Sequence, residues 1–102
     1  MSTDAQIIIK SREGTHGNFR QTARTANLVR DALLAHGLIA MAPVQQESLN
    51  MIATKLARIV CGNPDCAEHW LDIQGYCELV LEDIAHEEQM RKQSGAERSI
   101  GV

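Results

Sequence analysis

The stretch PVQQESLNMIATKLARIVCG, from Pro43 to Gly62, decides the fold class. Its apolar residues recur at spacings of three, four and three, the period of an amphipathic α-helix. These apolar residues are Leu49, Ile52, Leu56 and Ile59. Proline suits the first helical position and glycine suits the residue after the last turn. The stretch therefore predicts a helix from about Pro43 to Gly62.

Similar patterns on the N-terminal side predict two more helices. Thr3 with Gln6 predicts a capping box and a short helix to about Arg12, which the segment 13–18 breaks with its two glycines. Asn18 with Gln21 resembles a second cap, for a helix that ends at residues 36–37. The expected apolar stripe of this second helix is Phe19, Thr22, Ala26, Val29 and Leu33.

A fourth helix is expected to begin with Asn63 as cap and Pro64 as first residue. Its apolar stripe is Cys66, Trp70, Ile73, Cys77, Val80 and Ile84. No strand pattern competes anywhere in the chain. We therefore predict an all-α protein, with a short N-terminal helix plus three longer antiparallel helices forming a small bundle. Residues 1–90 would form a single helical domain, and residues 91–102 a polar, disordered tail.

Composition excludes several classes of protein. The 102 residues are 44% hydrophobic and 23% charged, as in a globular domain, and no apolar run approaches the ~18 residues of a membrane span. The N-terminus lacks a basic region and a long apolar stretch, so no secretory signal is expected. The odd count of three cysteines fits free thiols in a reducing compartment, and we expect a cytoplasmic protein.

The charges divide unevenly along the chain. The net charge is −3, but residues 1–60 carry +3 and residues 61–102 carry −6. The simpler interpretation is two solvated faces; the alternative is pairing of the two halves, within the chain or head to tail in a homo-oligomer. Nucleic-acid binding is not expected, because only 3% of residues are aromatic and the best basic stripe has three arginines. These arginines are Arg20, Arg24 and Arg30.

Several polar groups are candidates for a site. On the fourth helix, Asp72 and Tyr76 lie one turn apart and can share a hydrogen bond, with His69 nearby. Gly75 between them indicates close approach of another helix or a ligand. A solvated border with ordinary salt bridges is the alternative for this stripe.

On the third helix, Glu47 and Asn50 precede a basic pair, Lys55 and Arg58, suited to phosphate or an acidic partner; a solvated face is again the alternative. His16 lies between two glycines in a predicted turn, close to Arg12. It is a candidate ligand contact or part of a plain interhelical turn.

Two cysteines and a histidine, at Cys61-x4-Cys66-x2-His69, invite a zinc interpretation. Structural zinc needs four ligands and only three are local. Burial of the cysteines as small apolar residues is the favoured alternative.

Three blocks of sequence carry a resemblance. SREGTHGNF at 11–19, PVQQESLNMIATKLARIVCGNP at 43–64 and HWLDIQGYCELV at 69–80 resemble a family of small uncharacterised proteins of tailed bacteriophages and prophages. The family's features are a THG element, a K-x2-R-I helix and a D-x2-GY helix, and the resemblance covers about residues 9–82. It points to Arg12, His16, Gly17, Glu47, Lys55, Arg58, Asp72, Gly75 and Tyr76.

The helical pattern is also distantly similar to the all-α nucleotide pyrophosphohydrolases of the MazG type. Those enzymes cleave nucleoside triphosphates between the α and β phosphates, with magnesium held by the acidic pairs E-x2-E and E-x2-D. Here Glu47-x2-Asn50 and Asp72-x2-Gly75 each keep one carboxylate. The resemblance implies catalytic Asp72 and Glu47, and a hydrated magnesium on Glu47, Asp72 and Asn50. It also implies nucleotide contacts from Lys55, Arg58, Tyr76, His16 and Arg12.

Two functions follow as hypotheses. The favoured one is a non-enzymatic phage accessory protein that acts as a helical interaction module. It rests on the small size, the divided charge and the incomplete acidic pairs. The alternative is a magnesium-dependent nucleotide-binding or nucleoside triphosphate pyrophosphohydrolase-like domain. The sequence leaves open whether the protein is an enzyme.

Overall fold

The computed structural model describes residues 3–100, with side chains for all of them except Ser11 and residues 95–100. Its elements are α1 (Asp4–His16), α2 (Phe19–Ala35), the 3-10 helix η1 (Leu38–Ala40), α3 (Pro43–Cys61) and α4 (Ala67–Ile100). No strand occurs in this part of the chain. The predicted all-α class, with one short and three longer helices, is confirmed.

The first two helices begin where the sequence predicts. Thr3 Oγ1 accepts from the Gln6 N–H at 3.2 Å, and Gln6 Oε1 accepts from the Thr3 N–H at 2.9 Å, which completes the capping box. Asn18 caps α2 through its Oδ1 atom, which accepts from the Arg20 and Gln21 N–H groups. The predicted end of α1 at residue 12 is wrong, since the helix continues to His16. It ends at Gly17, whose φ of 80° is a conformation that glycine adopts readily.

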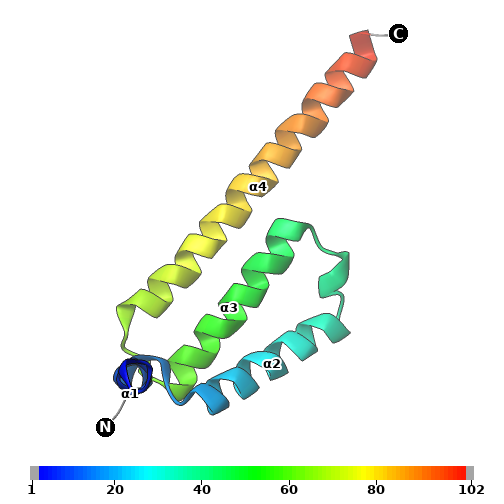
Figure 1. Ribbon diagram of the computed structural model, residues 1–102. Helices are drawn as coiled ribbons and strands as arrows, with labels where there is room; N and C mark the ends of the chain where they lie inside the picture. The colour runs from blue at the N-terminus through cyan, green and yellow to red at the C-terminus, as the bar shows by residue number, and fades with distance from the viewer. Residues whose placement is uncertain (1–2, 101–102) are drawn as a thin grey trace.

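Helix α3 lies between α2 and α4 and runs antiparallel to both (Figure 1). On one side, Arg30 of α2 donates to the Asn50 carbonyl at 3.2 Å. On another side, Lys55 pairs with Asp72 of α4. Asn50 and Lys55 point about 140° apart round the helix. Helix α3 is therefore buried along two lines and not along one stripe.

This double packing changes which residues of α3 are buried. The buried positions are Ser48, Ala53, Ala57 and Ile59. Of the predicted stripe only Ile59 is fully buried, and Leu56 is 39% exposed. Small side chains on the lines of contact allow neighbouring helices to approach closely, whereas the larger apolar residues lie between those lines. A single-stripe prediction could not anticipate this arrangement.

Helix α4 differs from its prediction in start and in register. Asn63 Oδ1 accepts from the Asp65 N–H at 2.9 Å, so residues 63–65 form a turn and the helix begins at Ala67. The more buried positions are His69, Ile73, Tyr76, Val80 and Asp83, a line rotated by about 60° from the predicted stripe. Trp70, expected in the core, is 53% exposed. Cys77 and Ile84, on the same predicted stripe, are also exposed.

The C-terminal segment is helical as far as Ile100, and residues 101–102 lie outside the described part; the disorder expected for residues 91–102 stays a prediction. Extending an existing helix costs little, and the segment contains good helix formers such as Arg91, Lys92 and Ala96. The end of α4 projects beyond α2 and α3 (Figure 1). None of the described helices has the length and hydropathy needed to cross a membrane.

The core is small for a chain of this size. Among the described residues, the buried apolar side chains are Ala26, Leu38, Ala53, Ala57 and Ile59. Phe19, predicted to lie on the apolar stripe of α2, is 80% exposed. The largest fully buried side chain is not apolar at all but a histidine, His69.

Candidate functional site

The C-terminal ends of α1 and α3 meet through two glycines. A Cβ atom added to Gly62 would lie 2.4 Å from the Thr15 carbonyl oxygen, and one added to Gly17 would lie 2.5 Å from the Cys61 carbonyl oxygen. The Asn63 N–H also donates to the Thr15 carbonyl at 3.2 Å. The two backbones are thus in direct contact, which fixes the end of α1 on the end of α3.

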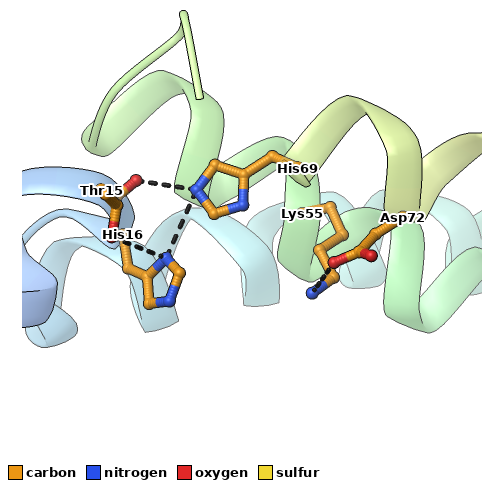
Figure 2. A network of polar contacts seen from close by, with 5 residues as sticks. All are labelled: Thr15, His16, Lys55, His69 and Asp72. Atoms are coloured by element: carbon orange, nitrogen blue, oxygen red, sulfur yellow. Dashed lines mark hydrogen bonds and ion pairs between the residues drawn. The ribbon is translucent and has the colours of Figure 1, made fainter. Parts of the chain in front are cut away.

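His69 of α4 closes this junction from the third side. Its side chain is 1% exposed, and its Nε2 lies 2.8 Å from the Thr15 carbonyl oxygen and 3.3 Å from His16 Nδ1 (Figure 2). A carbonyl oxygen only accepts, so His69 Nε2 carries a proton and donates it. His16 then presents an unprotonated Nδ1 to the same N–H group. One backbone carbonyl thus joins α1, α4 and the loop after α3.

An ion pair lies one turn further along α4. Lys55 Nζ is 2.8 Å from Asp72 Oδ2, with side chains that are 11% and 49% exposed (Figure 2). The hydrogen bond from Lys55, and then its charge, lower the pKa of Asp72 below its ordinary value. Asp72 is therefore ionised at neutral pH, and the pair links α3 to α4 beside the histidines.

Positive charge gathers round His16. Burial lowers the pKa of His16 below its ordinary value of 6.5, and the charges of Arg58, His69, Arg12 and Lys55 lower it further. We call Arg12, His16, Lys55 and Arg58 the cationic cluster. The Lys55–Asp72 pair is its one ion pair among the described residues, so Arg12 and Arg58 have no carboxylate partner there. The cluster keeps an excess of positive charge.

Five of the residues predicted for a site act on one another through their charges. The charges of Arg58, Arg12 and Lys55 add to the effect of burial on the pKa of His16, and the hydrogen bond and charge of Lys55, with the charge of Arg58, lower the pKa of Asp72. Tyr76 is half-buried on the same helix as Asp72, but no hydrogen bond joins its side chain to Asp72 or to any other described residue. The predicted Asp72–Tyr76 hydrogen bond is therefore wrong.

Two predicted residues lie elsewhere on α3. Glu47 is exposed and about 16 Å from Arg58 along the helix axis, and its side chain makes no hydrogen bond or ion pair with the described residues. Asn50 lies on the side that faces α2, where its carbonyl accepts from Arg30. Within one chain, Glu47, Asn50 and Asp72 do not meet at one point.

Metal ligands are not grouped in the described part of the chain. No set of three or more His, Cys, Asp or Glu side chains there is placed to hold a metal ion. Asp72 is already paired with Lys55, His69 is bonded to Thr15, and Cys61 Sγ lies 3.4 Å from Thr25 Oγ1. The residues of one chain thus do not fit a magnesium cage. Magnesium binding stays a prediction from the sequence.

The sequence prediction missed the centre of the site. The sequence assigns Thr15 no role and Gly62 only the end of a helix, and it predicts His69 on the polar stripe of the fourth helix or as a zinc ligand. A signal was present, since Gly17 and Gly62 each end a helix and the only histidine close after Gly62 is His69. Gly75, by contrast, was expected to admit a neighbour, and the structure has nothing within 4 Å of a Cβ atom built there.

Comparison with protein-family models, curated proteins and solved structures finds no match to this chain. The fold and the site alone therefore define its class. It is a small all-α protein in which the ends of α1, α3 and α4 meet at a buried histidine, beside an undercompensated cluster of basic side chains.

Proposed function

We propose that this protein binds a phosphate-bearing ligand at the cationic cluster. One observation carries the proposal: Arg12, Lys55 and Arg58, from α1 and α3, lie near enough for their charges to lower the pKa of His16 beyond the effect of its burial, and among the described residues Asp72 is the only carboxylate in an ion pair with this cluster. Like charges so gathered repel one another, and an anionic ligand relieves that repulsion. The chain as a whole is negative, so the cluster is not a consequence of a generally basic surface.

The chemistry of the side chains favours phosphate over a simple carboxylate. An arginine guanidinium donates two parallel N–H groups that match two phosphate oxygens, and lysine adds a compact charge. Because Nδ1 of His16 faces the His69 N–H, the neutral imidazole of His16 carries its proton on Nε2, which can donate to an anion. These groups come from helix ends that the Gly17–Gly62 contact holds in place, so the site exists before the ligand binds.

Among phosphate-bearing ligands, we favour nucleotides. The resemblance to nucleotide pyrophosphohydrolases supports this choice, and the proposal extends only to binding of the phosphate group. Catalysis by Glu47 and Asp72 stays a separate hypothesis, because the two carboxylates do not converge within one chain.

Calorimetric titration with pyrophosphate and with a panel of nucleotides, with and without magnesium, tests the proposal. Arg58→Gln removes an unpaired charge of the cluster, and we expect it to weaken pyrophosphate binding at least about tenfold. Arg24→Gln is the matched control, since Arg24 is an exposed arginine on α2 outside the cluster. Absence of binding at millimolar ligand, or equal weakening by both variants, would contradict the proposal.

A second function, the helical interaction module, is favoured by a different observation. Many large apolar side chains are exposed in the described part of the chain, among them Leu28, Val60, Trp70 and Leu81. Exposed apolar residues on this scale mark an interaction surface. A phage accessory role, expected from the resemblance, fits such a module.

A further inference from the structure

Helix α1 is buried against the rest of the protein only at its last turn. Its described side chains from residue 4 to residue 14 are all exposed, whereas Thr15 and His16 are half-buried. Even the three isoleucines at 7–9 are at least 50% exposed. Burial of apolar side chains therefore does little to hold α1 before Thr15, and the polar contacts of the last turn decide whether the helix stays docked.

Three atoms of this last turn and of α4 share one proton. The Thr15 carbonyl oxygen can only accept; His69 Nε2 lies 2.8 Å from it, and His16 Nδ1 lies 3.3 Å from the same Nε2 (Figure 2). With a proton on His69 Nε2 and none on His16 Nδ1, one N–H group faces two acceptors. This arrangement is complete only while His16 is neutral.

A proton on His16 Nδ1 breaks a hydrogen bond between α1 and α4 in every arrangement. With His69 in its present tautomer, two N–H groups face each other. In the other tautomer, His69 Nε2 accepts from His16 but turns a lone pair toward the Thr15 carbonyl. Thr15 Oγ1, 3.4 Å from Nδ1, is a further acceptor, and a proton directed to it no longer faces His69.

The surroundings of His16 also oppose a positive charge on its ring. Burial, and then neighbouring charges, lower the pKa of His16 below its ordinary value of 6.5, and none of those charges is a carboxylate. From α2 the contact is the Thr22 hydroxyl, which donates to the His16 carbonyl at 2.9 Å. Asp72 of α4 is paired with Lys55. The charged and titratable groups that face His16 are Arg58 and Lys55 on α3, His69 on α4 and Arg12 on α1.

We propose that His16 and His69 form an acid-sensitive latch, in which protonation of His16 releases α1 from α3 and α4 while the other helices stay packed. Gly17, with a φ of 80°, is the pivot, because the next residue, Asn18, already caps α2. The latch belongs to the protein without a ligand, and it goes beyond phosphate binding.

The rest of the fold has its own contacts, which do not involve α1. The buried apolar side chains of the described residues all lie on α2, η1 and α3. Arg30 of α2 donates to the Asn50 carbonyl of α3, and Lys55 of α3 pairs with Asp72 of α4. Release of α1 therefore leaves the packing of α3 against α2 and α4 in place.

The direction of the pH effect follows from the neutral form of His16. Neutral His16 holds α1 docked, and the imidazole of a released α1 returns to its ordinary pKa of 6.5. Docking is therefore complete above pH 6.5 and is lost as the pH falls through the lowered pKa of the docked state.

Amide hydrogen exchange of the full chain between pH 8 and pH 4.5, without ligand, tests the latch. The Asn63 N–H is the reporter, because it donates to the Thr15 carbonyl across the junction at 3.2 Å. Its protection factor, which corrects for the intrinsic effect of pH on exchange, should fall at least about fivefold on acidification. Amides of α1 should lose protection with it, since a helix of 13 residues is marginal alone. Protection within α2 and α3 should stay unchanged.

Two variants and one titration complete the test. His16→Asn puts a neutral oxygen in the place of Nδ1, where it accepts from the His69 N–H at every pH, so Asn63 protection should no longer change. His36→Asn is the matched control, because His36 is exposed at the end of α2; this variant should behave as the parent does. The midpoint of the loss in the parent should coincide with the titration of the His16 imidazole in proton NMR.

Several results would overturn the latch. One is Asn63 protection that does not change with pH in the parent, and another is loss of protection in α2 and α3 together with α1, which is global unfolding. A His16→Asn protein that still loses Asn63 protection on acidification, or lacks it at pH 8, also overturns the latch. All samples are free of phosphate, so binding of pyrophosphate can succeed or fail separately.

Discussion

At the scale of single residues, the Thr15 carbonyl oxygen organises the site. It accepts hydrogen bonds from the Asn63 N–H and from His69 Nε2, and it lies where a Cβ atom at residue 62 would have to be. A carbonyl at the end of a helix carries partial negative charge and lacks an intrahelical donor, so both bonds satisfy a group that would otherwise be costly to bury. The position of His16, and with it the cationic cluster, depends on this arrangement.

Substitution by alanine should have opposite effects on stability at Gly62, in the crowded contact between helix ends, and at Gly75, on an open part of α4. Gly62→Ala forces a Cβ atom against three backbone atoms, and we expect a loss of roughly 1–3 kcal/mol or more in the free energy of unfolding. Gly75→Ala meets nothing within 4 Å and should stabilise α4 by about 0.5–1 kcal/mol. Urea unfolding of both variants measures the two effects. Destabilisation by Gly75→Ala would show that a neighbour does pack there.

The histidine pair should make stability depend on pH. The pKa of His16 is lowered in the folded state, so the unfolded chain binds more protons between that lowered pKa and 6.5. Stability due to neutral His16 is complete above this window and is lost as the pH falls through it. His16→Gln removes the effect, so the stability difference between parent and variant should shrink on acidification from pH 8 to pH 5. A difference that grows in thermal unfolding over this range would contradict the assignment.

At the scale of elements, the sequence predicts where α1, α2 and α3 begin and where α2 and α3 end, but not which side of each helix is buried. Capping at Thr3 and Asn18 is local chemistry, and both caps are present. The buried line of α4 is not local, because His69 gains its partner from α1, more than fifty residues earlier. The apolar stripe at Trp70, which periodicity alone assigns to the core, is displaced to the surface.

The residues of the candidate site could likewise be predicted only in part. Residue chemistry and the resemblance indicated Arg12, His16, Lys55, Arg58 and Asp72, which the structure gathers. Glu47 and Asn50 sit on the correct helix but at the wrong height or on the wrong side. Helix height and rotation depend on tertiary contacts, which one sequence does not contain.

The Lys55–Asp72 pair should link α3 and α4 only above the acid range. Lys55 lowers the pKa of Asp72 below 3.8, so the stability from ionised Asp72 is present above pH 3.8 and is lost as the pH falls through the lowered pKa. Asp72→Asn should therefore be less stable than the parent at pH 7, and the difference should shrink as the pH falls from 3.8 toward 2. Because Asp72 is 49% exposed, solvent screening keeps the effect modest. Chemical denaturation at the two pH values checks this, with Asp65→Asn as an exposed, unpaired control.

At the scale of the whole molecule, the net charge of −3 conceals two features of opposite sign. The cationic cluster is local, at the junction of α1, α3 and α4, whereas the acidic residues spread along α4. An anionic ligand is thus attracted at short range and repelled by the molecule as a whole.

Salt should therefore act mainly on the local attraction. Screening shortens the reach of charges from roughly 14 Å to 7 Å between 50 and 200 mM salt. We expect the affinity for pyrophosphate to fall several-fold over this range, as followed by calorimetry in a salt whose anion binds weakly. Affinity that is independent of salt would indicate a binding site away from the cationic cluster.

The central claim is that the phosphate group binds beside His16. Proton NMR titration of the His16 imidazole, without and with saturating pyrophosphate, tests it most directly. In the free protein the pKa of His16 should lie below 6.5, and a bound anion should raise it, because negative charge favours the protonated imidazole. A His16 pKa that is the same with and without bound pyrophosphate would contradict the account.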